Sequence, residues 1–257
     1  MSAKNLPESY LSRVKVASSI RITAILIIPF VLISLPLAAI AEESIYDNAQ
    51  SLMDEGKFDE AEAALNKRLS SDDKDVVALS LLGEVYHRKN DRDKAIKFLD
   101  KAVSIDPKYP AAYLYRGKLY FSMQKFDEAA DEFSLYIENM RPLIISSPEN
   151  IDQYIANLHD ISQISFELKR YDLLYETLSD ILRLSPKDQP ATYNMGIYYY
   201  IYERDRPKSY SYFTKAVELD PSTQTASKAR YAIEFMRSNP DPRVEPDFSF
   251  IDKEYRD

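Results

Sequence analysis

Apolar residues recur every three or four positions along most of the chain, which is the period of a helix with one buried stripe. The segment LLGEVYHRKNDRDKAIKFLDKAVSIDP, residues 81–107, contains two such stretches separated by a polar break. EGKFDE, residues 55–60, forms a similar break earlier in the chain. Fourteen prolines against four glycines are typical of helices that end near proline, and less so of a turn-rich β-protein. The pattern predicts an all-α chain of short, paired helices.

The same columns of residues return at intervals of 34 positions. KAVSIDP, residues 101–107, comes back as KAVELDP at residues 215–221, and Gly83 has counterparts in Gly117 and Gly196. Glycine inside a helix costs about 0.5–1 kcal/mol relative to alanine, so its recurrence indicates that two helices cross closely there. The facing column, in the second helix of each pair, holds Ala61, Ala95 and Ala129.

Two insertions interrupt the 34-residue spacing. Eleven extra residues enter around ENMRPLIISSPENIDQY, residues 138–154, and one enters the turn ERDRPKS, residues 203–209. Eleven residues is close to three helical turns, so this insertion can lengthen helices without rotating their faces. Ser147 followed by Pro148 is typical of a helix start, and we expect a long helix over residues 148–168.

A 34-residue period with small, aromatic, alanine, bulky and proline residues in this order resembles the tetratricopeptide repeat, a helix–turn–helix unit that stacks into a superhelix. The resemblance runs from residue 42 to about residue 221 and implies an all-α, right-handed superhelical solenoid of antiparallel helix pairs. The predicted repeats lie near residues 42–75, 76–109, 110–143, 148–188 and 189–221. A capping helix at 222–237 and a proline-rich extended tail at 238–257 follow, and the tail could either dock on the solenoid or fray.

The N-terminal segment carries a targeting pattern. Residues 22–41, ITAILIIPFVLISLPLAAIA, are uncharged and follow a basic stretch that ends at Arg21. Ala39 and Ala41 form an A-x-A site, so residues 1–41 are predicted to be a signal peptide. An uncleaved N-terminal membrane anchor is the alternative, because 20 apolar residues can also span a bilayer. In either case we expect the body to be exported, periplasmic or extracellular, or else membrane-anchored and facing outward.

Charge and composition narrow the classes of partner. The net charge is −8, and since the first 41 residues carry +3, the remainder carries −11. An acidic body of this kind argues against nucleic acid or an anionic membrane as partner, so membrane contact is expected only through an uncleaved N-terminal segment. The chain has no cysteine, which excludes disulfides, thiolate catalysis and a cysteine-ligated zinc site.

No motif of catalytic chemistry stands out. The two histidines, His87 and His159, are separated by two repeats, which favours ordinary helix-surface roles over a shared metal. H-x-x-x-H, G-x-S-x-G, P-loop and G-x-G-x-x-G patterns are absent from the sequence. We therefore assign no catalytic residue, cofactor or metal and predict a non-enzymatic protein. An unrecognised hydrolase or transferase stays as a remote alternative.

The first helices of such a solenoid line its concave side, and their residues outside the core face the groove. The predicted partner-binding groove consists of Tyr46, Gln50, Glu84, His87, Arg88, Leu114, Tyr115, Lys118, Phe121, His159, Gln163, Phe166, Tyr193, Asn194, Ile197 and Tyr200. Tyrosine and phenylalanine are frequent interface anchors. We predict an extracytoplasmic scaffold or adaptor that grips a protein or peptide segment, within an envelope or secretion-related complex.

Two further readings of the groove concern other ligands. Some tetratricopeptide domains hold a C-terminal carboxylate with lysines and asparagines, but Tyr46 and Gln50 occupy the corresponding columns of the first repeat, so this clamp is not supported. The tyrosine-dense segment YNMGIYYYIYERDRPKSYSYF, residues 193–213, raises the alternative of an envelope polysaccharide-binding module. Packing of these tyrosines against the capping helix and the tail is the competing structural explanation.

Overall fold

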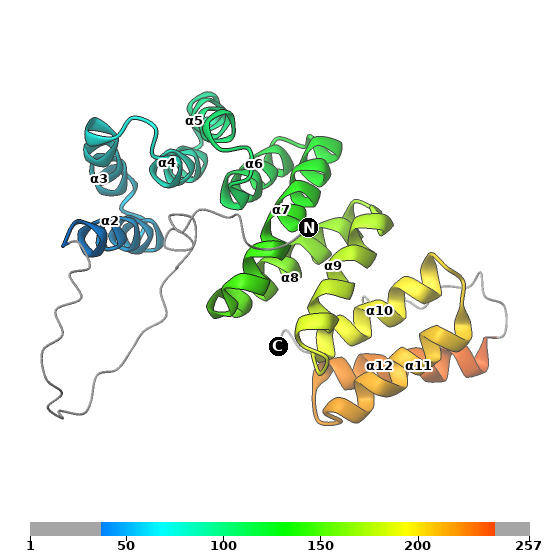
Figure 1. The fold of residues 1–257 in the computed structure, drawn as a ribbon. Coiled ribbons are helices and arrows are strands. Elements are labelled where there is room, and N and C mark those ends of the chain that lie inside the picture. Colours follow the sequence, from blue (N-terminus) through cyan, green and yellow to red (C-terminus); the bar gives the residue numbers. More distant parts are fainter. Residues whose placement is uncertain (1–36, 240–257) are drawn as a thin grey trace, which may run out of the picture. The chain divides into compact units, whose positions relative to one another are not determined.

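The computed structural model describes residues 37–239, with side-chain environments from residue 45 onward. These residues form eleven α helices and a single 3-10 turn, and no strand occurs among them (Figure 1). The predicted all-α class built from antiparallel helix pairs is confirmed. The predicted signal peptide up to residue 36 and the predicted tail from residue 240 lie outside the described residues. The first described helix begins at Leu37, so the predicted A-x-A site falls near its start.

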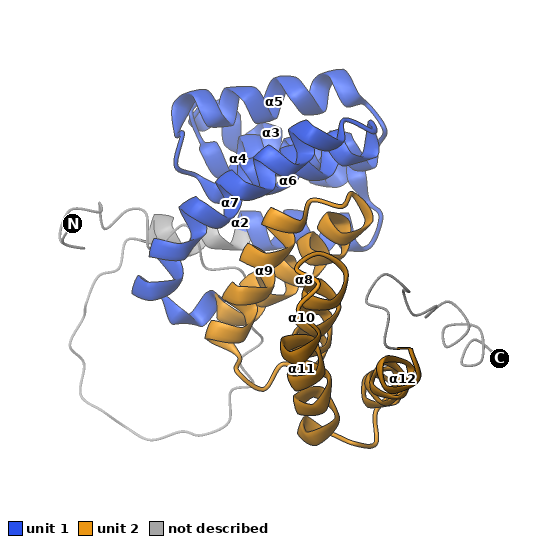
Figure 2. Ribbon diagram, turned by 90° about the vertical axis from the view of Figure 1, so that its right-hand side faces the viewer, with its two compact units in different colours: residues 1–150 blue, residues 151–257 orange. Residues whose placement is uncertain are grey.

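The chain divides into two compact units, and unit 1 ends at Asn150 (Figure 2). Its three hairpins are α2 (Leu37–Asp54) with α3 (Phe58–Ser71), α4 (Val76–Arg88) with α5 (Arg92–Ile105), and α6 (Pro110–Ser122) with α7 (Phe126–Ser146). The 3-10 turn η2 (Pro148–Asn150) follows α7. Successive hairpins pack through α3 against α4 and α5 against α6, so the second helix of each pair meets the first helix of the next.

Unit 2 begins at Ile151 and repeats this arrangement. It contains α8 (Ile151–Glu167) with α9 (Tyr171–Leu184), α10 (Gln189–Ile201) with α11 (Arg206–Leu219), and the single helix α12 (Gln224–Ser238). Helix α12 packs against both α10 and α11, as a capping helix does. The Thr223 side chain accepts a hydrogen bond from the Ala226 amide, so it caps the first turn of α12.

The eleven inserted residues all lengthen helices. Helix α7 has 21 residues whereas α3 and α5 have 14 each, and α8 has 17 whereas α4 and α6 have 13 each. The expected helix over residues 148–168 is corrected at its start, because Pro148–Asn150 is a 3-10 turn and α8 begins at Ile151. Ser147, the C-cap residue of α7, has φ −138° and ψ 80°, outside the helical region, and the 3-10 turn η2 separates it from α8.

Each hairpin turn uses one residue in the left-handed conformation. Gly56, with φ 75°, fills this position in the first hairpin, as its place in the inter-helix break predicts. The equivalent residues in the other hairpins are Asn90, Gln124, Lys169 and Arg204, with φ between 57° and 60°. Four side-chain-bearing residues therefore adopt a backbone region that favours glycine, because the hairpin geometry requires it.

The small-residue column marks close helix crossings. A Cβ atom on Gly83 would lie 2.4 Å from Cγ of Leu99, and one on Gly196 would lie 2.8 Å from the ring of Phe213. Gly117 meets the ring of Phe133 in the same way, at 2.6 Å. The facing alanines Ala61, Ala95 and Ala129 are all fully buried. The predicted close packing of first and second helices is confirmed, and glycine is needed because the partner side chain occupies the space of a Cβ.

Candidate partner-binding site

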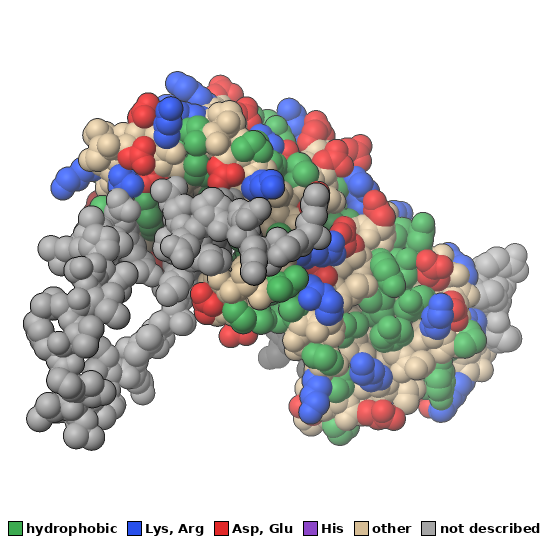
Figure 3. Space-filling model, viewed as in Figure 1, with side chains coloured by type: hydrophobic (Ala, Val, Ile, Leu, Met, Phe, Trp, Pro, Cys, Tyr) green, Lys and Arg blue, Asp and Glu red, His purple; other side chains and the backbone are tan. Residues whose placement is uncertain are grey.

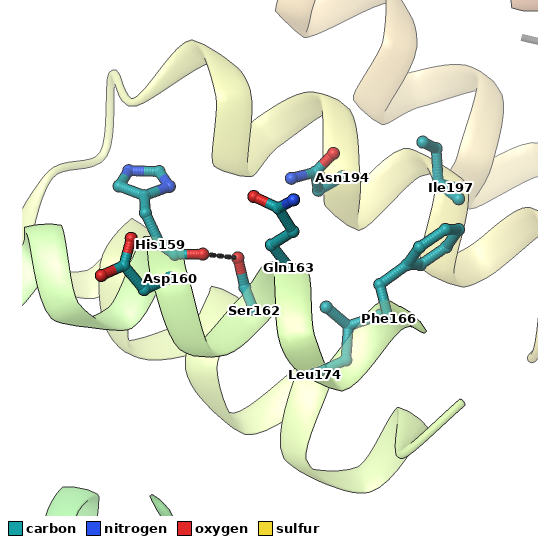
Figure 4. A pocket seen from close by; sticks show the side chains of 8 residues that line it. All are labelled: His159, Asp160, Ser162, Gln163, Phe166, Leu174, Asn194 and Ile197. Atoms are coloured by element: carbon teal, nitrogen blue, oxygen red, sulfur yellow. Dashed lines mark hydrogen bonds between the residues drawn. The ribbon is translucent and has the colours of Figure 1, made fainter. Parts of the chain in front are cut away.

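A pocket of about 350 Å³ lies in unit 2 among α8, α9 and α10 (Figure 4). Its lining residues are His159, Asp160, Ser162, Gln163, Phe166, Leu174, Asn194 and Ile197. Five of these eight belong to the groove predicted from the repeat register. The register therefore brings residues from two different first helices to one hollow.

The other three lining residues were not predicted as ligand-facing. Asp160 stands 34 residues before Asn194, in the same repeat column, so that column would have identified it. Ser162 belongs to the small-residue column and is 2% exposed, and its hydroxyl donates to the His159 carbonyl at 2.8 Å. Leu174 comes from the second helix α9, and a prediction restricted to first helices excludes it.

The pocket has an apolar end and a polar middle. Figure 4 shows the Phe166 ring beside Ile197, with Leu174 below them, and the Gln163 and Asn194 amides pointing toward one another. Leu174 is 2% exposed whereas Phe166 is 41% exposed, so the leucine forms a floor and the phenylalanine an accessible wall. Such a mixture of apolar surface and a few polar groups is typical of binding pockets.

His159 is held at the other end of the pocket by an internal contact. Its Nε2 lies 3.0 Å from a carboxylate oxygen of Asp188, and the other oxygen of Asp188 accepts from the Ala191 amide at the start of α10. Burial alone would raise the pKa of Asp188, but the bonds from His159 and Ala191 outweigh it, so the pKa lies below its ordinary value. His159 therefore connects two repeats as well as lining the pocket.

Two predicted groove residues of unit 2 are buried instead. Tyr193 is 7% exposed and lies 5.5 Å from the Phe213 ring, and Tyr200 is 2% exposed. Both belong to an apolar cluster with Ala229 and Met236 of α12. This corrects the groove prediction, because the capping helix covers the face of α10 on which these tyrosines lie. Their packing against the cap is the structural explanation that the sequence had left open.

Tyr46 in unit 1 occupies the same repeat position as His159, and it also contacts an aspartate of the next repeat. Its hydroxyl donates to Asp75, 29 residues later, and Asp75 also pairs with Arg68 at 2.8 Å and caps α4 through the Ala78 amide. Burial and the Asp75 carboxylate raise the pKa of Tyr46 well above its ordinary value. The predicted ligand contact is here an inter-repeat hydrogen bond.

The charged groove residues of unit 1 form a closed cluster. Arg88 donates to Glu84 at 2.8 Å and to the Met53 carbonyl at 3.2 Å, and Glu84 is 7% exposed. His87 Nδ1 lies 3.5 Å from the second oxygen of Glu84, and neither atom has a hydrogen-bond partner among the described residues. Burial alone would raise the pKa of Glu84, but the neighbouring His87 and Arg88 outweigh it and hold the pKa below its ordinary value.

The remaining predicted residues of unit 1 differ in accessibility. Leu114 is 5% exposed, which corrects its assignment to an open groove, and burial raises the pKa of Tyr115 well above its ordinary value. Gln50 donates to Asp54 at 3.4 Å on the surface. Lys118 and Phe121 are half-buried, with the Phe121 ring 5.8 Å from that of Phe126. These residues are placed on first helices as predicted, and none of them lines the pocket of unit 2.

A second surface of unit 2 is aromatic, and we call it the tyrosine patch. Its members are Tyr171 and Tyr175 of α9, Tyr199 and Tyr202 at the end of α10, and Tyr212 of α11, and three of them contact the buried ring of Tyr198. Tyr202 stacks on Tyr171 with ring centroids 4.9 Å apart, and it is 54% exposed. Figure 3 shows hydrophobic side chains gathered over α9 and α10. The patch therefore offers ring faces to solvent.

Within residues 37–239, no group of three or more histidine, aspartate or glutamate side chains is arranged to hold a metal ion. In the same part of the chain, no helix is both long enough and apolar enough to cross a membrane.

Comparison with known proteins matches part of the chain to a repeat family. Residues 83–124 match a family model described as TPR repeat, the tetratricopeptide repeat. The search of curated proteins found no match. Among solved structures, MamA is 23% identical, with 71% of this chain and 97% of that chain covered and a TM-score of 0.50.

Two further structures give the same fold. YrrB, described as a TPR protein with an unusual peptide-binding site, is 19% identical over 75% of this chain and 96% of its own, with a TM-score of 0.50. PilF of Pseudomonas aeruginosa is 15% identical over 79% of this chain and 86% of its own, with a TM-score of 0.56. At these identities the likeness shows the solenoid fold alone.

Proposed function

Because the chain carries tetratricopeptide repeats folded as packed helical hairpins, we propose that it is a non-enzymatic adaptor that binds a protein or peptide segment. The observation that carries this proposal is the pocket of unit 2, where an accessible phenylalanine wall adjoins two facing amides. Exposed aromatic anchors next to polar groups are typical of protein-binding surfaces. The description of YrrB as a peptide-binding TPR protein supports the same class of function.

Crosslinking in cells of the producing organism tests the proposal. A photoreactive residue in place of Phe166 is expected to give one dominant protein adduct, and a second change, Ile197→Asp, is expected to abolish it by placing a charge in the apolar end. Phe126 is the matched control position, since it is 42% exposed, close to the 41% of Phe166, and lies outside the pocket. The same adduct from both positions, or none from Phe166, would contradict the proposal.

The proposal includes export of the body beyond the cytoplasm, in an envelope or secretion-related complex. The basic stretch, the apolar run of residues 22–41 and the A-x-A site support it. Fractionation followed by N-terminal sequencing of the mature protein is the direct test. A new N-terminus at Glu42 outside the cytoplasm is expected, whereas an intact chain in the membrane fraction would indicate an anchor. An intact chain in the cytosol would contradict export.

A second candidate function follows from the tyrosine patch. Exposed rings such as Tyr202 and Tyr175, 54% and 43% exposed, present flat apolar faces edged by hydroxyl groups. Such faces suit an envelope polysaccharide. The test is binding to a glycan array, with Tyr202→Ala and Phe166→Ala compared. Glycan binding that depends on Tyr202 and not on Phe166, with no protein crosslink at the pocket, would favour this alternative over the adaptor.

A further inference from the structure

The apolar end of the pocket has room for a large side chain. A cavity of about 150 Å³ is enough to hold a benzene ring, and the pocket of unit 2 measures about 350 Å³. Phe166 keeps 41% of its surface exposed, and Leu174 closes the floor at 2% exposure. A ligand group that covers the exposed part of Phe166 removes apolar surface from water, which favours binding. The apolar end therefore favours a ligand that brings one large apolar group and leaves space for the chain that carries it.

The middle of the pocket offers paired amides. The Asn194 side chain has no hydrogen-bond partner among the described residues, and Gln163 donates to Glu167 at 3.2 Å, which leaves its carbonyl oxygen as an acceptor. Each amide group presents both a donor and an acceptor, the same pair that a peptide unit presents. Figure 4 shows the two amides facing one another from α8 and α10. A polypeptide backbone passing between them can bond to both.

Carboxylates outnumber basic side chains at the pocket. Of the eight described lining residues, none is lysine or arginine, and Asp160 contributes a carboxylate that also interacts within the chain. His159 is the one lining side chain that can carry a positive charge. Glu167 accepts a hydrogen bond from Gln163, and Asp188 contacts His159. The pKa of Asp188 lies below its ordinary value, so the Asp188 carboxylate is ionised at neutral pH. A carboxylate on the ligand would meet no lysine or arginine from the lining, and His159 is already paired with Asp188, so such a ligand is disfavoured. A neutral or basic ligand is favoured by charge complementarity.

From these three features we propose that the pocket recognises an internal, extended peptide segment that carries one large apolar side chain flanked by neutral or basic residues. The apolar side chain lies against Phe166, Leu174 and Ile197, and the backbone bonds to Gln163 and Asn194. A free C-terminal carboxylate and acidic flanks are rejected. This inference rests on the proposed adaptor function and specifies the chemistry of the partner.

Selection from two random ten-residue libraries tests it with the purified full chain. In one library the peptide is inserted into a loop of a carrier protein displayed on phage, so neither end is free. In the other, it forms the free C-terminus of the carrier. We expect binders from the loop library with one apolar position and with aspartate and glutamate depleted about tenfold around it. Acidic binders, binders from the C-terminal library alone, or no enrichment from either library would overturn the inference.

Matched variants assign the binding to the pocket. Gln163→Ala and Phe166→Ala are each expected to weaken a selected loop peptide about tenfold, measured by calorimetry. Gln153→Ala is the control for the glutamine, because Gln153 lies exposed on the same helix and bonds to Asn157 at 3.4 Å as Gln163 bonds to Glu167. Phe126→Ala is the control for the phenylalanine. Equal losses in variants and controls would place the peptide elsewhere and overturn the inference.

Charge discrimination gives the last readout. Asp160→Asn is expected to reduce the preference for basic over acidic flanks several-fold while binding of neutral peptides is kept.

Failure of the inference and failure of the adaptor function are distinguishable. A protein adduct at Phe166 in cells together with acidic selected peptides would overturn the inference alone, whereas no adduct and no selected peptide would overturn both.

Discussion

Units 1 and 2 use the same repeat position in different ways: the side chain is buried and paired in unit 1 and accessible in unit 2. Glu84 in unit 1 and Gln163 in unit 2 stand in the same column of the first helix, and each contacts the residue four positions later. Glu84 is buried at 7% exposure and paired with Arg88, whereas Gln163 is exposed and lines a pocket. The repeat register thus determines which face a residue is on, while its partners determine whether that face is open.

Other columns serve the same purpose in both units. Tyr46 and His159 each reach an aspartate 29 residues later, Asp75 or Asp188, at the start of the next first helix. Each aspartate also accepts a backbone amide of that helix, so one carboxylate caps a helix and joins two repeats. One joint in each unit is therefore built in the same way, whereas the column of Glu84 and Gln163 differs in use.

The largest expected effect tests what both units share. Gly83→Val and Gly196→Val are each expected to lower the free energy of unfolding by about 3 kcal/mol, because the new side chain would overlap Leu99 or Phe213. Urea unfolding followed by hydrogen exchange in each unit measures the loss. Ala156→Val, at an exposed position of α8, is the control and should cost well under 1 kcal/mol. A mild effect in one unit only would mean that the crossings are not equivalent.

The next prediction tests the column in which the units differ. Glu84→Ala is expected to cost about 1–3 kcal/mol, because Arg88 loses its buried partner and a space opens beside it. Gln163→Ala should leave the free energy of unfolding within about 0.5 kcal/mol, because that side chain is exposed. Denaturant midpoints of the two variants make the comparison. Similar losses would show that Gln163 is as structural as Glu84.

The shared contacts should respond alike and more weakly. Tyr46→Phe and His159→Phe each remove one hydrogen bond to the capping aspartate, which is worth about 1 kcal/mol. Tyr46→Phe also removes an acceptor of Arg68, which keeps its pairing with Asp75. The aspartates keep their bonds to the backbone of α4 and α10, so the helices stay capped. Thermal unfolding is the measurement. If His159→Phe left stability unchanged but abolished peptide binding, His159 would be a ligand contact and the two units would differ at this position after all.

The smallest effect on the free energy of unfolding is expected at acid pH, from protonation of Glu84. The pKa of Glu84 lies below its ordinary value of 4.5, so the carboxylate stabilises the folded state above that pH and the contribution is lost as pH falls through the lowered pKa. Glu84→Gln should therefore lose less stability than the wild type between pH 5 and pH 3, about 1 kcal/mol or less. Hydrogen exchange in unit 1 at both pH values gives the comparison. A steeper loss in the variant would contradict the lowered pKa.

The sequence predicted more of the fold than of the binding site. Five pocket residues followed from the register, including Gln163 and Asn194, because one helix face repeats every 34 residues. Leu174 was missed because it comes from a second helix. Tyr193 and Tyr200 were misplaced because nothing in their own helix indicates that α12 covers them. Accessibility depends on side chains distant in sequence, which a helical period does not contain.

By itself the sequence determined the paired helices, through their periodicity, and the close helix crossings, through residue size. It also determined that the eleven inserted residues can lengthen helices, because their number is close to three helical turns. Tertiary structure alone decided which groove columns are open. Arg88 closes the column at Glu84, α12 covers Tyr200, and α8, α9 and α10 leave a hollow between Phe166 and Asn194. A pocket is a property of packed neighbours, so it exists only once helices from different repeats meet.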